Sequence, residues 1–425
     1  MENVRRIDRL RQIKTLIRGS DKYLIVGVDI AKNKHYAFFG SANGKSYLRK
    51  FIFENDIKGL NSLIEKANSI KKKYQLHEVV FGLESTANYH KPIAESLIRN
   101  GYDVVLVSSL ATKRNRELLD GRWDKNDKKD AANIADLISQ GKCLYYDYPC
   151  QSMKSIRSLL SLKRKLMKQK HAQKMRIRSN IIAPYFPEMD VYMTHIEDAC
   201  LAAINVCLDP KKLSEIDYSL FFKWVTSTSV CLKQQKRIRD LCEVAKHSIG
   251  CEVTDAAQFE ACLMVESLRR TKTLLETIEK KLKKERSKFT DYEYLLSIPG
   301  FGPTIATMML GAIGDPNRFE NGRQVLKLAG LDLSASRSGQ SSMNVKARIS
   351  KKGKAELRYA LYHAAFTASS RHKFMKSWFE SKTEQRKNEK GIGMKTRIKL
   401  SAKLLIIAWT LMKRKECFDP AFIKI

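Results

Sequence analysis

The chain has 425 residues, enough for two or three domains that each bury a core. Its 79 Lys and Arg residues outnumber 45 Asp and Glu residues, which leaves a formal net charge of +34. No small acidic substrate needs so much charge, so the composition favours a polyanionic partner, with nucleic acid as the first candidate. The alternative is a solvated basic surface, as in ribosome-associated factors.

No segment of the sequence predicts a membrane or export function. The longest apolar run, LLIIAW at 404–409, is far shorter than the roughly 20 residues that a membrane helix needs. The first residues, MENVRRIDRLRQIKTLIRGSDK, are charged throughout, so we expect no signal peptide. Nine cysteines form no CxxC pair and no Cys/His cluster, which argues against a zinc site and against a disulfide framework. We expect a cytoplasmic protein with no membrane partner.

Residues 1–150 predict a mixed α/β domain. Runs such as YLIVGVDIA, HYAFFG and SYLRKFIF are rich in β-branched and aromatic residues, and the turn SANGKS separates the last two. We expect strands at 23–31, 35–40, 46–53, 78–86 and 103–109, and helices at 56–74, 90–101 and 123–138. The first three strands have no helix between them, which favours a sheet of ribonuclease-H type over an alternating Rossmann fold.

Two long helices predict a coiled-coil region at 151–290. The first, at about 152–182, is strongly basic, has apolar residues at a broken three-to-four spacing, and ends at PYFP. The second, at 261–289, places Leu268, Leu275, Ile278 and Leu282 on one side. The two helices pack antiparallel within one chain or join partner chains, and the sequence leaves both open. Residues 291–425 predict a third, mostly helical domain.

Four acidic residues stand where a ribonuclease-H-like sheet gathers its metal ligands. Asp29 ends the first strand, and Glu84 ends a later strand. Asp127 and Asp130 are three residues apart, so they share one face of a helix and repel each other. Mg²⁺ prefers carboxylate and water oxygens, and would remove this repulsion. Two such ions, roughly 3.5–4 Å apart, can stabilise both the attacking and the leaving oxygen of a phosphoryl transfer.

The same acids also have simpler interpretations. Asp124 or Asp127 can cap a helix, and carboxylates in a first turn suit the helix dipole. Asp136 lies further along the same helix and is either a substitute ligand or a solvent-facing residue. Only the order of the four acids along the chain, two at strand ends and two on a helix face, indicates a metal site.

Two motifs in the last domain point to nucleic acid. IPGFGPTIA, at 298–306, has the form of a helix-hairpin-helix turn whose following helix could present N–H groups to a phosphate. A tight helix–helix connection inside a core explains it equally well. SASRSGQSS, at 334–342, concentrates serines beside Arg337, but a serine needs a base, a metal or a cationic setting to attack a phosphodiester. Taken alone, it predicts a phosphate-contacting loop.

Together, these segments resemble the Piv/DEDD family of insertion-sequence transposases. The resemblance runs from about Tyr23 to Ala365. It rests on VGVDIAK, GLESTANYH, KNDKKDAANIADLI, LLSIPGFGPTIATMMLGAIGD and LAGLDLSASRSGQSS, followed by ISKKGKAELRYALYHAA. It implies a RuvC-like domain with Asp29, Glu84, Asp127 and Asp130 as Mg²⁺ ligands, one or two ions per site. It also implies a coiled-coil middle and a C-terminal transposase domain whose Ser-Gly motif maps to Ser338.

The resemblance implies an activity and partners as well. Family members recombine donor and target DNA, guided by a structured bridge RNA, as dimers and tetramers. A serine forms a covalent link to DNA, strands exchange through a Holliday junction, and acids and serine from different subunits form a composite site. It places the protein in the cytoplasm of a bacterium or archaeon, with the nucleoid.

The sequence departs from the family pattern at two places. GLDLSASRSG has neither the usual proline after GL nor a paired serine before the glycine, so Ser336 and Ser341 remain candidates beside Ser338. Asn126 stands where the family has Thr, which we expect to change a local cap. Two other functions remain open: a RuvC-like nuclease or junction resolvase in which water attacks, and a non-catalytic nucleic-acid scaffold.

Overall fold

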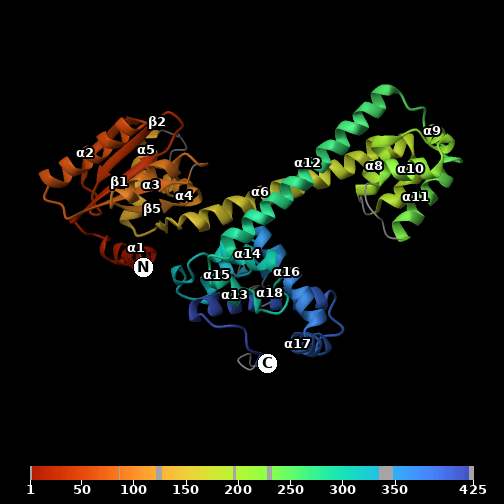
Figure 1. The fold of residues 1–425 in the computed structure, drawn as a ribbon. Coiled ribbons are helices and arrows are strands. Elements are labelled where there is room, and N and C mark those ends of the chain that lie inside the picture. Colours follow the sequence, from red (N-terminus) through yellow and green to blue (C-terminus); the bar gives the residue numbers. More distant parts are fainter. Residues whose placement is uncertain are drawn as a thin grey trace. The chain divides into compact units, whose positions relative to one another are not determined.

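The computed structural model describes residues 2–85, 87–120, 127–194, 198–226, 232–334 and 348–420 (Figure 1). These residues form two compact units. The first comprises 1–150 and the short segment 315–321, and the second comprises 151–314 and 322–425. Within the described ranges, no helix is long and apolar enough to cross a membrane. The seven cysteines whose side chains are described are free thiols.

The first unit is built on a six-stranded mixed sheet with the order β3-β2-β1-β4-β5-β6. β1, β4 and β5 run parallel. β2 pairs antiparallel with β1, β3 with β2, and β6 with β5. The strands are β1 (Tyr23–Asp29), β2 (Lys34–Gly40), β3 (Ser46–Glu54), β4 (Glu78–Glu84), β5 (Asp103–Val107) and β6 (Leu144–Tyr145). The helices are α1 (Glu2–Leu16), α2 (Ile57–Lys73), α3 (His90–Arg99), α4 (Ser109–Asp120) and α5 (Asp127–Ser139).

Helices cover both faces of this sheet. Side chains on a strand alternate between the two faces, so an apolar strand contributes to a core on each face. On β1, Leu24, Val26 and Val28 pack into one core with α2 and α3. Ile25 points to the opposite core, which α1 and α5 complete. This explains why β1 is apolar at nearly every position instead of alternating with polar residues.

The predicted order of strands and helices in this unit is confirmed, including the β1–β2–β3 meander. Two elements were missed. Helix α4 was not predicted, because SLATKRNRELLD has few apolar residues, and the two-residue strand β6 is too short for a pattern. The predicted helix at 123–138 is described from Asp127 onward, and its first residues lie outside the described ranges.

The second unit contains the two long helices, α6 (Gln151–Arg176) and α12 (Asp255–Arg286). They pack against each other within the chain. Lys163 Nζ donates to Glu279 Oε2 at 2.6 Å, and Gln173 Nε2 donates to Ser267 Oγ at 2.8 Å. As the residue number increases along α6, the number of the bonded residue on α12 decreases, so the two helices are antiparallel. Of the two arrangements that the sequence left open, the intrachain one is present.

A separate helical core lies at the far end of this pair. It gathers residues of η1, α8, α10, α11 and the first half of α12 (Figure 1). The elements between the two long helices are η1 (Ile177–Ile182), α7 (Ala183–Tyr185), η2 (Pro187–Thr194), α8 (Asp198–Val206), α9 (Pro210–Glu215), α10 (Tyr218–Val225) and α11 (Leu232–Ala245). The described residues between the two long helices are therefore mostly helical.

The remainder of the second unit is a mostly helical bundle. Its elements are α13 (Asp291–Leu296), α14 (Pro303–Ile313), α15 (Gly322–Ala329), β7 (Leu333–Ser334), β8 (Arg348–Ile349), α16 (Ala355–Arg371), α17 (Lys373–Glu384) and α18 (Ile392–Arg414). α16 is central and packs against α14, α17 and α18. The turn η3 (Pro316–Arg318) belongs to the first unit, where Arg318 Nη1 lies 2.7 Å from Asp147 Oδ2.

Candidate functional site

Asp29 and Glu84 end two neighbouring parallel strands. Val28 on β1 pairs with Leu83 on β4, so the next residue of each strand is one of these acids. Gly27 and Gly82 are also paired, two residues earlier on each strand. Because side chains repeat every second residue on a strand, Gly27, Gly82, Asp29 and Glu84 all belong to the same face of the sheet. Both acids are partly exposed.

Helix α5 crosses this face directly over the two glycines. A Cβ atom built on Gly27 would lie 2.2 Å from the Ala131 carbonyl oxygen. One built on Gly82 would lie 1.9 Å from Ile138 Cδ1. The absence of side chains therefore lets α5 approach the sheet more closely than any other residue would allow. Asp130 precedes Ala131 and is only 5% exposed, so the approach fixes one predicted acid at the sheet.

Helix α4 is hydrogen-bonded to Glu84 and to helix α5. The Thr112 hydroxyl donates to Glu84 Oε2 at 3.0 Å. Asn133 Nδ2 on α5 donates to the Thr112 carbonyl at 2.7 Å, and Asn115 Nδ2 donates to Asn133 Oδ1 at 2.7 Å. These buried amides join α4 to α5. They also hold Thr112, which donates to Glu84.

Asp130 forms an ion pair with Arg116. Arg116 donates from Nε to Asp130 Oδ1 at 2.9 Å, and its Nη2 lies 2.6 Å from the same oxygen. Both side chains are mostly buried, at 21% and 6% exposed, so the pair is little screened by water. Such a pair is costly to break from one side, because the remaining carboxylate would be buried without a counter-charge.

Asp136 is engaged elsewhere. Its Oδ2 accepts from Asn115 Nδ2 at 2.7 Å and from Gln140 Nε2 at 2.8 Å. These bonds give Asp136 a structural role at the α4–α5 contact. The interpretation of Asp136 as a solvent-facing residue is wrong, because it is held by two amides.

The donor types at the strand ends fit a divalent cation. Glu84 Oε2 accepts from Thr112, and no described residue donates to its Oε1. Hard carboxylate oxygens of this kind suit Mg²⁺. Among the side chains that the structure describes, no three Asp, Glu, His or Cys groups converge into a cluster that could hold a metal. The side chains of Asp29, Glu84 and Asp130 are described and form no such cluster. Only the backbone of Asp127 is described, so the quartet stays a prediction.

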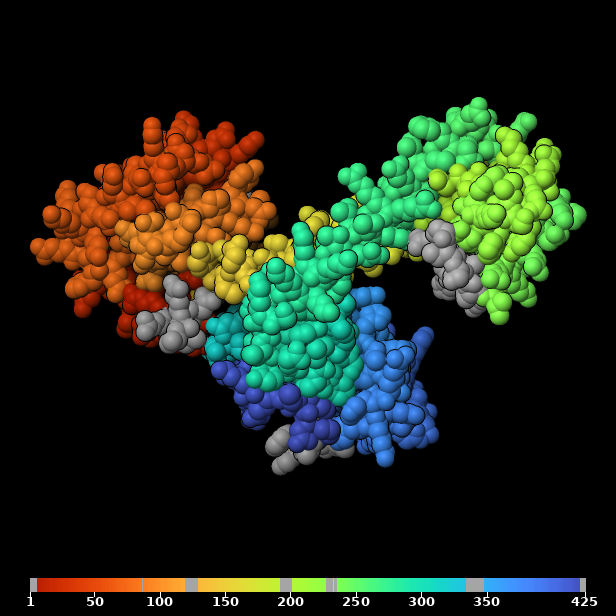
Figure 2. Space-filling view, in the orientation of Figure 1, coloured from red at the N-terminus to blue at the C-terminus, as the bar shows by residue number. Residues whose placement is uncertain are grey.

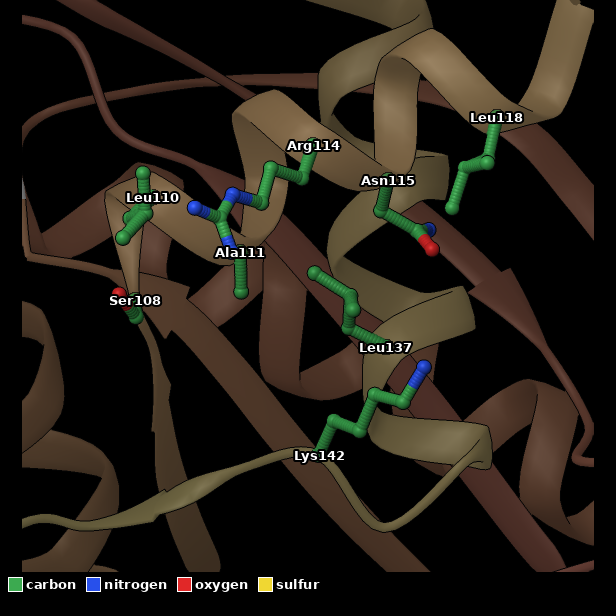
Figure 3. A pocket seen from close by; sticks show the side chains of 8 residues that line it. All are labelled: Ser108, Leu110, Ala111, Arg114, Asn115, Leu118, Leu137 and Lys142. Atoms are coloured by element: carbon green, nitrogen blue, oxygen red, sulfur yellow. The ribbon is translucent and has the colours of Figure 1, made fainter. Parts of the chain in front are cut away.

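A cavity of about 360 Å³ opens beside α4 and the end of α5 (Figure 3). Leu110, Ala111, Leu118 and Leu137 give it a mostly apolar wall, and Arg114 and Lys142 lie at its edge. No acidic residue lines it, so it is not the metal site. Asn115 contributes to this wall while its amide bonds to Asn133 and Asp136.

The serine candidates Ser336, Ser338 and Ser341 lie outside the described residues. The residues on either side of them are described. Leu333 pairs with Ile349 and Ser334 with Arg348, so β7 and β8 pair antiparallel, and we call this pair the hairpin base. Ser350 Oγ donates to Asp332 Oδ1 at 2.5 Å and fastens this base.

The segment IPGFGPTIA forms a tight connection between α13 and α14. Gly300 has φ of +86°, and a Cβ there would lie 2.3 Å from the Ala364 carbonyl oxygen on α16. Ile298 and Phe301 are buried. The first half of the turn therefore serves the core, while the exposed residues Gly302 and Pro303 begin α14.

Sequence reasoning missed Thr112, Asn115 and Arg116. They are spaced i, i+3 and i+4, so on a helix they share one face. Thr112 and Asn115 are buried and Arg116 is partly so. The available signal was a set of polar residues at helical spacing directly after a strand. Until their bonding partners are known, such a set predicts only a solvated helix face.

Comparison with known proteins now identifies the group. Residues 26–187 match a family model described as "Transposase", and residues 292–381 match one described as "Transposase IS116/IS110/IS902 family". The chain belongs to the IS116/IS110/IS902 family of transposases. It is 21% identical over 411 residues to the "Insertion element IS116 uncharacterized 44.8 kDa protein" of Streptomyces clavuligerus. That alignment covers 93% of this chain and 96% of the relative.

Membership of this family gives the coarse function. The chain is a transposase of an insertion element, so it is a DNA-processing enzyme and DNA is a partner. The net charge of +34 agrees, since contacts to a phosphate backbone require many Lys and Arg side chains. The first matched region holds all four predicted acids, and the second holds the three candidate serines.

Proposed function

We propose that this transposase is a DNA recombinase that cleaves and rejoins donor and target DNA. It does so with a RuvC-type acidic site and a serine nucleophile. The sites are Asp29, Glu84, Asp127 and Asp130 for Mg²⁺, and Ser338 for the covalent link. The observation that carries the proposal is the paired position of Asp29 and Glu84 at the ends of β1 and β4, on the face that α5 covers.

The sheet order supports a RuvC-type domain. An antiparallel β1–β2–β3 meander is followed by parallel β4 and β5, and the final helix carries the last two acids. In the proposal, two carboxylates come from strand ends and two from helix α5, and Mg²⁺ draws them together at the ends of β1 and β4. Mg²⁺ bound there would stabilise the charge that develops on the phosphate oxygens during strand cleavage.

The protein's own residues have separate parts in this proposal. Thr112 donates to Glu84 Oε2, and in the proposal Oε1 is the oxygen that binds the cation. Arg116 neutralises Asp130 while the carboxylates are free of metal. Ser338 Oγ attacks phosphorus and loses its proton, and the displaced deoxyribose oxygen gains one. A deoxyribose hydroxyl of the exchanged strand then attacks the phosphoserine and releases the serine.

A guide RNA and self-association complete the proposal. Helix α6 carries nine Lys and Arg residues and no acidic residue, which suits a second polyanion beside DNA. Lys174 on this helix has a pKa below its ordinary value, because it is partly buried and lies beside Lys170 and Lys272. Cations crowded in this way are stabilised by an anionic partner. We propose that the partner is the bridge RNA, on a dimer or tetramer.

The decisive experiment looks for protein covalently attached to DNA. The full chain is incubated with Mg²⁺, donor DNA, target DNA and RNA from the ends of its element, and adducts are resolved on denaturing gels. Ser338→Ala is expected to abolish the adduct, and Ser342→Ala, in the same loop, is expected to keep it. An adduct that survives in Ser338→Ala assigns the nucleophile to Ser336 or Ser341.

The same assay separates the alternatives. Cleavage that proceeds without any adduct would identify a nuclease or resolvase in which water attacks. Binding without strand breakage would identify a scaffold. If Asp29→Asn or Glu84→Gln left cleavage unchanged, the acidic site would be wrong even if the serine were right.

A further inference from the structure

Helix α16 carries an exposed row of aromatic rings. Its buried face is aliphatic and packs into the bundle through Leu357, Leu361 and Ala364. On the opposite face, Tyr359 is 67% exposed and Phe366 is 49% exposed, with exposed His363 between them. The residues are spaced i, i+4 and i+7, so they form one stripe. The exposed side of a surface helix is ordinarily polar, and three rings there need a reason.

The rings of this stripe are ordered by contacts within the protein. The Tyr359 and His363 rings meet edge to face with centroids 4.3 Å apart. The Arg397 guanidinium lies over Phe366 at 4.8 Å and over Phe379 at 4.8 Å. Arg397 Nε is buried, with no hydrogen-bond partner among the residues that the structure describes. A guanidinium held between two rings fixes the orientation of Phe366 on the stripe.

The charge around the stripe selects its partner. Residues 348–371 contain six Lys and Arg residues and one acid, Glu356. Glu356 is already paired with Arg164. A second copy of this chain on the stripe would place the same cations opposite one another, which is unfavourable. An unpaired nucleic-acid strand offers both base faces for the rings and phosphates for the cations.

The position of the stripe favours DNA. α16 begins six residues after β8, and the proposed nucleophile lies between β7 and β8 in the sequence. Arg358 Nη1 donates to the Ala329 carbonyl at 2.9 Å and to the Lys351 carbonyl at 3.3 Å, which fixes the first turn of α16 to the hairpin base. From Tyr359 to Phe366 the helix rises about 10 Å, the length of about three stacked bases.

We infer that Tyr359, His363 and Phe366 form a stacking platform for an unpaired DNA strand next to the β7/β8 hairpin base, with Arg397 positioning the Phe366 ring. This inference rests on the proposed function, because it places the strand that the serine cuts. The platform holds bases exposed when the cleaved duplex opens, without reading their sequence. Stacking serves any base, since each has a π-face.

The test measures binding in EDTA, so that it needs neither metal nor cleavage. The full chain is titrated into a fluorescein-labelled single-stranded DNA 20-mer, the RNA 20-mer of the same sequence, and the DNA duplex. Tyr359→Ala combined with Phe366→Ala is expected to weaken single-stranded DNA binding about ten-fold or more and duplex binding less than two-fold. Tyr359→Phe combined with Phe366→Tyr keeps the rings and is expected to keep the affinity.

A matched control uses another exposed apolar pair. Phe259 and Leu263 on α12 are 66% and 50% exposed and are also spaced i, i+4, so Phe259→Ala with Leu263→Ala reports any general loss of surface contact. Unchanged affinity of the Tyr359/Phe366 alanine variant for single-stranded DNA would overturn the inference. A loss of affinity confined to the RNA probe would also overturn it. So would a lower molar mass of the variant in solution, because that would show the stripe to be a contact between chains. A failed covalent-adduct assay would sink the proposed function and leave these binding results as they stand.

Discussion

The Thr112 hydroxyl lies 3.0 Å from Glu84 Oε2 and donates a hydrogen bond to it. The same residue accepts from Asn133 through its carbonyl oxygen. A single residue of α4 therefore connects the acid at the end of β4 to the helix that carries Asp130. This connection makes the geometry of the acidic site depend on a helix that contributes no metal ligand.

Thr112→Val should impair DNA cleavage without unfolding the domain. The substitution keeps the shape and removes the hydroxyl, and a hydrogen bond to a charged carboxylate contributes roughly 1.5–3 kcal/mol. We expect cleavage to fall about ten-fold or more and the Mg²⁺ concentration for half-maximal cleavage to rise. Thr112→Ser retains the donor and should retain most activity. Equal activity of the valine and serine variants would show that the bond does not position Glu84.

Arg116→Ala should destabilise the protein in the absence of metal. It leaves Asp130 buried without a counter-charge, at a cost of roughly 3 kcal/mol. Mg²⁺ should then raise the melting temperature of this variant by more than it raises that of the wild type, because the ion replaces the lost cation. Arg114→Ala, two residues earlier and exposed, is the matched control and should behave as wild type. A variant that melts lower and ignores Mg²⁺ would place Asp130 outside the metal site.

Gly27→Ala should displace α5 from the sheet. The new Cβ would meet the Ala131 carbonyl oxygen, which is backbone and cannot turn away. We expect a loss of about 1–3 kcal/mol in the free energy of unfolding, together with lost cleavage. Gly322→Ala is the control, because its nearest neighbour is 3.6 Å away. Chemical denaturation of both variants measures the difference, and an unchanged Gly27→Ala would mean that α5 sits further from β1.

The α6–α12 pair should weaken in acid. Burial raises the pKa of Glu279, but hydrogen bonds from Lys163 and Arg286 outweigh this and hold the pKa below its ordinary value of 4.5. A lowered folded-state pKa contributes stability above the unfolded-state value, and that contribution is lost as pH falls through the folded-state pKa. Glu279→Gln should therefore flatten the fall in melting temperature below about pH 4.5. Glu276→Gln, exposed on the same helix, should leave the acid limb as in wild type.

The strands were predictable because each carries a dense apolar or β-branched run. Leu24 to Val28 on β1 are buried on both faces, and such a run has few alternatives to a strand. Asp29 and Glu84 could be placed at strand ends for the same reason. Their pairing across β1 and β4 could not, because strand register depends on contacts that are distant in sequence.

Helix α4 was not predictable from apolar periodicity. Its inward face is made of Thr112, Asn115 and Arg116, whose burial is favourable only because Glu84, Asn133 and Asp130 are there to bond them. The exposed rings on α16 were missed for the opposite reason. Tyr359 and Phe366 read as ordinary helix residues until the structure identifies which face is buried.

The central claim is that Asp29 and Glu84 bind a divalent cation at the ends of β1 and β4. Titration of the full chain with Mn²⁺, followed by the loss of the free-ion signal in electron paramagnetic resonance, tests it most directly. The account predicts tight binding that Mg²⁺ displaces, that Glu84→Gln abolishes, and that Asp136→Asn preserves because Asp136 is held by Asn115 and Gln140. Undiminished Mn²⁺ binding by Glu84→Gln would contradict it.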